Sequence, residues 1–179
     1  MIEIVDVSYN DLVDMARIEA ASIVHENRSD GYAPGLEDLV SLWQNRFMFK
    51  SHKAFLLKDE NVAKGMMGMQ LPLKKGIITA LYIAPQFFRN GYGKLLVAKA
   101  EEIVLENGGN SLVVEVQKHN FRALQFYKRL QFVETKVKFT HLIELKKGWF
   151  KCLRSVLSEL AEEWDMSFGI AALEWIVLK

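Results

Sequence analysis

Hydrophobic and polar positions along this chain follow two spacings, one typical of strands and the other of helices. Segments whose apolar residues alternate with polar ones, or run on continuously, are expected to be strands at 2–7, 53–58, 62–72, 76–85, 111–116, 132–145 and 172–179. Apolar residues three or four positions apart predict helices over about 8–23, 36–47, 92–104, 120–130 and 148–164. The polar stretch 25–35, with its glycines and proline, is expected to be a loop.

Local signals mark several of these boundaries. Ser8 and Asp11 resemble a capping box at the start of the first helix. Pro85 ends the strand before it, because proline has no backbone N–H to donate. The glycines in 107–109 stop the long middle helix, and Asn120 is suited to cap the helix that follows it.

The order of elements over 76–130 predicts the fold class. A strand, a glycine-containing turn, a helix, a strand and a second helix form a βαβα unit in which the strands 76–84 and 111–117 run parallel. With the other elements this makes a mixed α/β domain whose central sheet has about seven strands flanked by helices. A single domain over 1–179 is expected, in which 148–164 forms an extra helix between the last two strands.

Composition limits the classes of function. The chain has 179 residues and a net charge of +1, so neither nucleic acid nor an anionic membrane is expected to attract it. Cys152 is the only cysteine and the four histidines show no ligand spacing, so no metal site is expected. The sequence shows no signal-peptide pattern and no apolar run of the roughly 20 residues that span a bilayer. A soluble cytoplasmic protein is therefore expected.

The turn before the middle helix has little side-chain bulk where the backbone could meet an anion. It consists of Arg89, Asn90, Gly91, Tyr92, Gly93 and Lys94. A helix N-terminus presents unpaired N–H groups, so a phosphate could approach this backbone, although a glycine pair also suits an ordinary tight turn. The dinucleotide fingerprint fails because its third glycine is Leu96, and the nucleoside-triphosphate loop fails at Phe88 and Leu95.

A second candidate feature lies in the helix 120–130. Asn120 and Tyr127 are seven residues apart, close to two helical turns, so they share one face with the small Ala123 between them. This face suits a ligand that lies along the helix. An N-cap followed by a half-buried aromatic residue explains the same pattern without a ligand.

Taken together, these features resemble the GNAT superfamily of acetyl-coenzyme A-dependent N-acetyltransferases. The resemblance covers roughly 53–133 and rests on the strand ending at Pro85, the Gly-x-Gly turn, and the N-x-x-A-x-x-x-Y spacing from Asn120 to Tyr127. Its last part is most similar to bacterial enzymes that acetylate the N-terminus of a ribosomal protein. The chain departs from the family pattern at Phe88, where the family has Gln or Arg, and at Gln131, where it has Gly.

The resemblance implies a coenzyme site and two catalytic residues. Acetyl-CoA would be the co-substrate, with its pyrophosphate wrapped by residues 89–94. The backbone of Leu81, Tyr82 and Ile83 would hold the pantetheine arm and the acetyl group, and Asn120 would contact the coenzyme. A strand glutamate would be the base and a helix tyrosine the acid, which in this chain are Glu115 and Tyr127.

The residues leave alternatives open for the chemistry. An amine must lose a proton before it attacks a thioester, and Glu115 could take that proton, or could be a solvated or salt-bridged strand residue. Water or His119 could act in its place. The phenol of Tyr127 could protonate the departing thiolate. A route through an acetylated Cys152 is not expected, because this cysteine lies far in sequence from the core motif.

Two functions fit the sequence. The first is an N-acetyltransferase acting on a primary amine of a peptide or protein N-terminus or of a small molecule; the second is a non-catalytic acyl-CoA-binding module that regulates a partner. An acceptor site is expected from the 25–35 loop, the second helix and 132–170, whose mixed charges do not identify the acceptor. The apolar final strand, 172–179, leaves a homodimer open.

Overall fold

The computed structural model describes residues 1–26, 34–49, 51–138 and 140–149. Its strands and helices alternate much as the apolar spacing predicts. In chain order the elements are β1 (Ile2–Asp6), η1 (Tyr9–Asp11), α1 (Leu12–Glu26), α2 (Leu36–Phe47), β2 (His52–Asp59), β3 (Val62–Gln70), β4 (Lys75–Ile83), η2 (Pro85–Phe87), α3 (Tyr92–Glu106), β5 (Ser111–Gln117), α4 (Phe121–Arg129), β6 (Val133–Lys138) and β7 (Leu142–Gly148).

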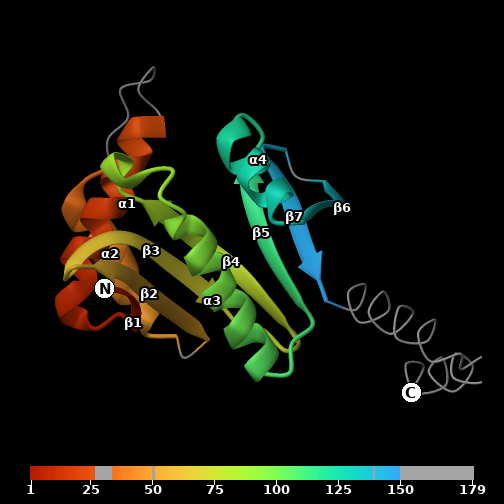
Figure 1. Cartoon of the computed structure of the whole chain (residues 1–179), viewed down its shortest axis with the longest axis horizontal. Helices are drawn as coiled ribbons and strands as arrows, with labels where there is room; N and C mark the ends of the chain where they lie inside the picture. Colours follow the sequence, from red (N-terminus) through yellow and green to blue (C-terminus); the bar gives the residue numbers. More distant parts are fainter. Residues whose placement is uncertain (27–33, 50, 139, 150–179) are drawn as a thin grey trace, which may run out of the picture. The chain divides into compact units, whose positions relative to one another are not determined.

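These strands form one mixed sheet in the order β1-β2-β3-β4-β5-β7-β6, which confirms the predicted α/β class and strand number (Figure 1). Strands β4 and β5 are parallel, as the βαβα order predicts, whereas β1 to β4 pair antiparallel. Helices cover both faces of the sheet. Two glycines of β3 show this, because residues three apart on a strand face opposite sides of the sheet. A Cβ atom added to Gly68 would meet Trp43 of α2, and one added to Gly65 would meet Leu96 of α3 among its neighbours.

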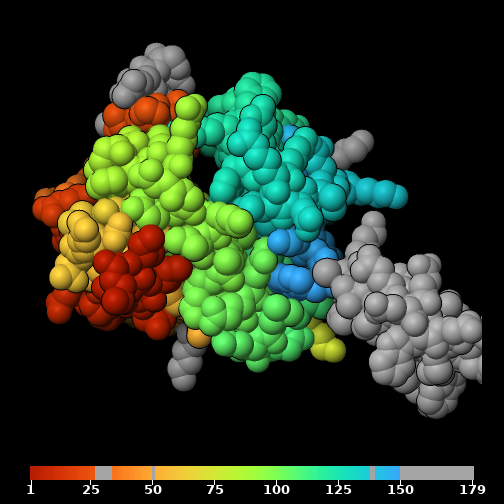
Figure 2. Space-filling model, viewed as in Figure 1, coloured from red at the N-terminus to blue at the C-terminus, as the bar shows by residue number. Residues whose placement is uncertain are grey.

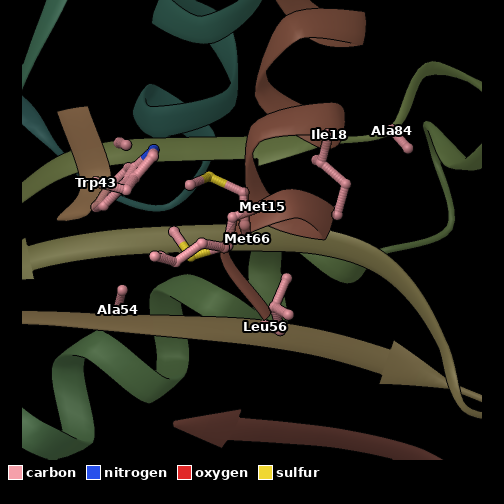
Figure 3. Close-up of a cluster of buried hydrophobic side chains, with 9 residues drawn as sticks. Met15, Ile18, Trp43, Ala54, Leu56, Met66 and Ala84 are labelled. Atoms are coloured by element: carbon pink, nitrogen blue, oxygen red, sulfur yellow. The ribbon is translucent and has the colours of Figure 1, made fainter. Parts of the chain in front are cut away.

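The core beneath α1 and α2 is built around Trp43, which is almost completely buried (Figure 3). Met15 and Ile18 of α1 pack there with Met66 of β3. The indole N–H of Trp43 donates a 2.7 Å hydrogen bond to the carboxylate of Glu19, which is itself buried. Burial raises the pKa of Glu19, although this hydrogen bond acts in the opposite direction. The bond therefore satisfies a buried polar group and fixes α1 against α2.

Two bulges interrupt the regular pairing near the middle of the sheet. Between β2 and β3 the register passes from Leu57–Gly65 to Lys58–Ala63, so Lys64 is the extra residue in β3. Between β3 and β4 the register passes from Gly68–Ala80 to Met69–Ile78, so Thr79 is the extra residue in β4. A bulge bends its strand and redirects a side chain, and bulges are common beside functional sites.

The region after β5 differs from the prediction. The segment 132–145, expected as one strand, forms the antiparallel pair β6 and β7, and no helix lies between these two strands. A fourteen-residue strand would be unusually long, but the connecting residues contain no glycine or proline to announce the turn. From residue 150 on, the predicted helix 148–164, Cys152 and the predicted strand 172–179 lie outside the described residues. The single domain over 1–179 stays a prediction.

Candidate active site

A cleft opens where the two parallel strands of the sheet separate. Strands β4 and β5 pair only from Lys75–Ser111 to Ile78–Val114, and in the described part of the chain their later residues do not pair with each other. The separation begins at the bulged residue Thr79. The resulting cleft has a volume of about 1070 Å³. Figure 2 shows an opening between the yellow-green surface of the β4–α3 turn and the teal surface of α4. A volume of this size accommodates a cofactor-sized ligand.

Nearly all the site residues predicted from the sequence meet in this cleft. Its lining includes Leu81, Tyr82, Ile83, Arg89, Gly91, Tyr92, Gly93, Lys94, Glu115, Asn120 and Tyr127. Asn90 is exposed in the same turn but does not line the cleft. His119, the alternative base, is exposed and also lies outside the lining.

The backbone at the start of α3 is free to bind an anion. Gly91 is the N-cap and has a φ of 80°, a left-handed conformation that suits glycine. It offers no side chain to cap the helix, and the first turn contains no acidic residue. Within the described residues, no backbone hydrogen bond occupies the amides of Arg89 to Gly93. These donors and the helix dipole together favour a phosphate at this end of the cleft.

Helix α4 contacts the opposite lip of the cleft at two places. A Cβ added to Gly93 would lie 3.2 Å from the ring of Phe126, so this ring packs directly against the glycine backbone. One turn earlier, the guanidinium carbon of Arg122 lies 3.5 Å from the ring centroid of Phe88, a cation–π contact. The lip at Phe88 is thus held by a side chain from the facing helix.

The polar face predicted for α4 lies along the cleft. Asn120, Ala123 and Tyr127 all line it, and the side-chain oxygen of Asn120 caps the helix by accepting from the Ala123 amide at 3.0 Å. Tyr127 is buried between Phe126 and Phe132, with ring centroids 5.0 and 5.2 Å away. Burial raises the pKa of Tyr127 far above that of a free phenol, with a smaller contribution from Tyr82. The hydroxyl therefore stays protonated at neutral pH.

Glu115 projects from β5 one residue beyond the last pair with β4. Its side chain is exposed and lines the cleft, whereas its neighbours Val114 and Val116 are buried. Among the described residues, Glu115 takes part in no hydrogen bond or ion pair, which argues against the salt-bridged alternative. A carboxylate in this position can accept a proton inside the cleft.

Helix α1 supplies a wall of which the sequence identified only the end, because the loop 25–35 expected at the acceptor site begins with the last residues of this helix. Ser22 and Glu26 line the cleft beside Tyr82. The Ser22 hydroxyl donates a 2.8 Å hydrogen bond to the carbonyl of Ile83, which ties α1 to the end of β4. Burial, then the charges of Glu19 and Glu26, raise the pKa of Tyr82 to about 12. The spacing of Glu19, Ser22 and Glu26 places them on one face of a helix, and this polar face was the sequence feature that could have indicated the wall.

Neither a metal site nor a membrane span is found in the described ranges. No group of three or more histidine, cysteine, aspartate or glutamate residues is arranged there to hold a metal ion. No helix in the same ranges is both long and apolar enough to cross a membrane.

Comparison with known proteins places these features in a family. Residues 20–132 match the model of the Acetyltransferase (GNAT) family. An acetyltransferase from Thermus thermophilus superposes with a TM-score of 0.73 at 20% identity, over 83% of this chain and 97% of that chain. The PaiA N-acetyltransferase of Thermoplasma acidophilum, solved in complex with coenzyme A, gives 0.72 at 18% identity, over 83% and 99%. The ribosomal-protein-S18-alanine N-acetyltransferase of Escherichia coli gives 0.63 at 18%, over 82% and 91%.

Proposed function

The chain belongs to the acetyltransferase (GNAT) family, and we propose that it transfers the acetyl group of acetyl-CoA directly to a primary amine within the β4–β5 cleft. The family makes it an acetyltransferase that uses acetyl-CoA. The observation that supports this proposed reaction is a shared cleft. Within the described residues, a helix N-terminus with free amides, the unpaired edge of β4, Tyr127 and Glu115 all border it.

The coenzyme would lie along the cleft with its pyrophosphate at α3. The free amides of residues 89–93 would bind the pyrophosphate oxygens, with Arg89 and Lys94 adding positive charge. The edge of β4 at Leu81, Tyr82 and Ile83 has no partner strand on the β5 side in the described structure, so its amides and carbonyls are available to the pantetheine arm. The side chain of Asn120 would contact the arm from α4.

The proposed reaction forms a C–N bond and breaks the thioester C–S bond. Glu115 accepts a proton from the ammonium group, and the neutral amine nitrogen attacks the carbonyl carbon. A backbone N–H of β4 stabilises the oxyanion. As the C–S bond breaks, Tyr127 gives its proton to the thiolate. The nitrogen loses its second proton, which returns to Tyr127 through solvent. Glu115 releases the first proton to solvent, so both residues are regenerated and one proton is released per acetyl group transferred.

The acceptor side would be the wall made by α1. Ser22 and Glu26 are polar residues of that wall, and Tyr82 of β4 lies beside them. The sequence similarity around 114–132 favours the N-terminus of a protein or peptide as the amine. A small-molecule amine is the other acceptor class that this wall admits. Of the loop 25–35 expected at the acceptor site, residues 27–33 lie outside the described residues.

Release of free thiol from acetyl-CoA tests transfer against the alternative of a non-catalytic acyl-CoA-binding module. Wild-type protein would be assayed with a panel of peptides with free N-termini and of small amines, and the acetylated product would be identified by mass spectrometry. We expect amine-dependent thiol release with equimolar amide product. Tight coenzyme binding without turnover on any amine would favour the binding module. Wild-type protein that neither binds the coenzyme nor acetylates any amine would overturn the coenzyme site.

Replacement of Gly93 should weaken coenzyme binding. Gly93 lies in the first turn of α3, and the ring of Phe126 leaves little room there for a side chain. The branched side chain in Gly93→Val would fill the approach to the free amides. We expect the Kd for CoA, measured by calorimetry, to rise by roughly tenfold or more, since each tenfold corresponds to about 1.4 kcal/mol.

The matched control for this variant is Ala98→Val, which places the same side chain on an exposed position of the same helix. It adds the same branched side chain to α3 without narrowing the cleft. It lowers helix propensity, which Gly93→Val does not, so any effect of propensity alone would be larger in the control. Unchanged CoA affinity in a folded Gly93→Val protein, or an equal loss in Ala98→Val, would contradict the assignment of this turn to the pyrophosphate.

A further inference from the structure

The free N-terminus of α3 requires something other than a cap to hold it in place. Gly91 contributes no side chain, and no acidic residue of the first turn supports the exposed amides. Helix ends without side-chain caps fray easily, and an anion site needs donors that stay aimed at one point. Besides the contacts that α4 makes with Phe88 and Gly93, a second set of contacts restrains this turn from strands β2 and β3.

The first helical residue is anchored by a partly buried hydrogen bond. Tyr92 is 8% exposed, and its hydroxyl donates to a carboxylate oxygen of Asp59 at 2.9 Å. The same oxygen accepts from the ammonium group of Lys64 at 3.0 Å. Asp59 ends β2 and Lys64 lies in β3, and neither residue lines the cleft. Two hydrogen-bonding donors thus converge on one carboxylate behind the turn.

Lys64 also touches both ends of the turn. It is the bulged residue of β3, and its ammonium nitrogen lies 5.0 Å from the ring centroid of Phe87 and 5.8 Å from that of Tyr92. These two aromatic residues flank the turn residues 88–91. The carbonyl of Lys64 accepts a 2.9 Å hydrogen bond from the amide of Ala84, where β4 ends. A regular strand would have pointed this side chain elsewhere, because a bulge changes the direction of the residue it adds.

We propose that Asp59 and Lys64 are positioning residues for the pyrophosphate site. Together with Phe87 and Tyr92 they form a turn clamp that holds the segment 84–92 from behind, so that its free amides remain aimed into the cleft. The inference rests on the proposed coenzyme function. It adds residues that touch neither coenzyme nor acceptor, and it assigns the bulge in β3 a role in the reaction.

The clamp predicts an effect on coenzyme affinity that is separate from chemistry. Tyr92→Phe keeps the ring against Lys64 and removes only the hydrogen bond to Asp59. The amides of the turn would then sample several orientations, and each productive binding event would have to order them again. Tyr127 and Glu115, on α4 and β5, would keep their positions. Binding should therefore suffer while the step catalysed in the saturated enzyme continues.

The experiment measures KM for acetyl-CoA, kcat, and the inhibition constants of CoA and of pantetheine, which lacks the pyrophosphate. For Tyr92→Phe we expect KM and the inhibition constant of CoA to rise about three- to tenfold, which is the range for loss of one hydrogen bond of ordinary strength. The ratio of the CoA constant to the pantetheine constant should rise by the same factor, and kcat should change less than about twofold. Lys64→Met, which removes the cation, should shift the ratio in the same direction.

Lys58→Met provides the matched control. Lys58 precedes Asp59 on β2, and its 3.2 Å ion pair with Asp11 has similarly half-buried partners, but it lies away from the turn. Unchanged constants in both clamp variants, or equal shifts for CoA and pantetheine, would overturn the inference, as would an equal effect of Lys58→Met. Wild-type protein that does not bind CoA would overturn the proposed function itself and the inference with it.

Discussion

Tyr127→Phe should reduce turnover by about 10²- to 10⁴-fold, the range typical of a positioned general acid. The substitution keeps the ring between Phe126 and Phe132 and removes only the hydroxyl. Coenzyme affinity should change little, because the groups proposed to bind the pyrophosphate are the backbone amides of residues 89–93, which the substitution does not alter. The measurement is steady-state thiol release at saturating amine and acetyl-CoA, with CoA affinity determined separately by calorimetry.

The pH dependence of the wild-type rate gives a second test of the same residue. Burial raises the pKa of Tyr127 above the reference value of about 10. The acid therefore stays protonated up to at least about pH 10, and no loss of rate from its ionisation should appear below that pH. A decline below that pH that Tyr127→Phe abolishes would contradict the assignment.

Tyr9→Phe is the matched control, because Tyr9 is an exposed phenol outside the cleft. It should leave thiol release unchanged. Full activity in Tyr127→Phe would remove this residue from the mechanism and leave it as a packing residue of α4.

The parts of the fold that were predicted correctly depend on local signals. Helical spacing and Asn120 predicted α4, and the cap is formed as expected. The glycines at 107–109 end α3, where Gly108 has a φ of 68°. The parallel pair β4–β5 followed from the element order, since a strand, helix and strand in succession favour a parallel crossover. In each case a short stretch of sequence contains the whole physical cause.

The separation of β4 from β5 could not be predicted in this way. The segment 76–85 is apolar on nearly every residue, which indicates a strand covered on both faces but does not reveal that pairing stops after Ile78. The pairing stops where β4 carries a bulge at Thr79, and that bulge depends on how β3 is aligned with β4. Register is a long-range property, and one skipped residue changes it without a clear mark in the sequence.

The clamp and Ser22 of the α1 wall were missed for a related reason. Asp59 and Tyr92 are 33 residues apart, and Ser22 and Ile83 are 61 apart. Charged and hydroxyl side chains of this kind occur throughout a globular sequence, so their types alone do not single them out. Only the folded sheet brings the ends of β2, β4 and α1 to the two sides of the same turn.

Glu115→Gln should also reduce turnover by about 10²- to 10⁴-fold at neutral pH, and it should change the shape of the pH profile. An amine with a reference pKa near 10.4 for lysine, or near 8 for an α-amino group, is mostly protonated at pH 7. With the base removed, the variant depends on amine that is already neutral. Its rate should keep rising with pH as that fraction grows, whereas the wild-type rate should level off earlier.

The measurement is kcat/KM for the amine from about pH 6 to 10, with acetyl-CoA saturating. Glu3→Gln is the matched control, since Glu3 is an exposed carboxylate on another strand, outside the cleft. A wild-type profile in Glu115→Gln would leave this residue a solvated strand carboxylate. Because His119 does not line the cleft, the proton would then pass to water. The two variants together separate the proton taken from the amine from the proton given to the thiolate, which a change in one residue alone cannot do.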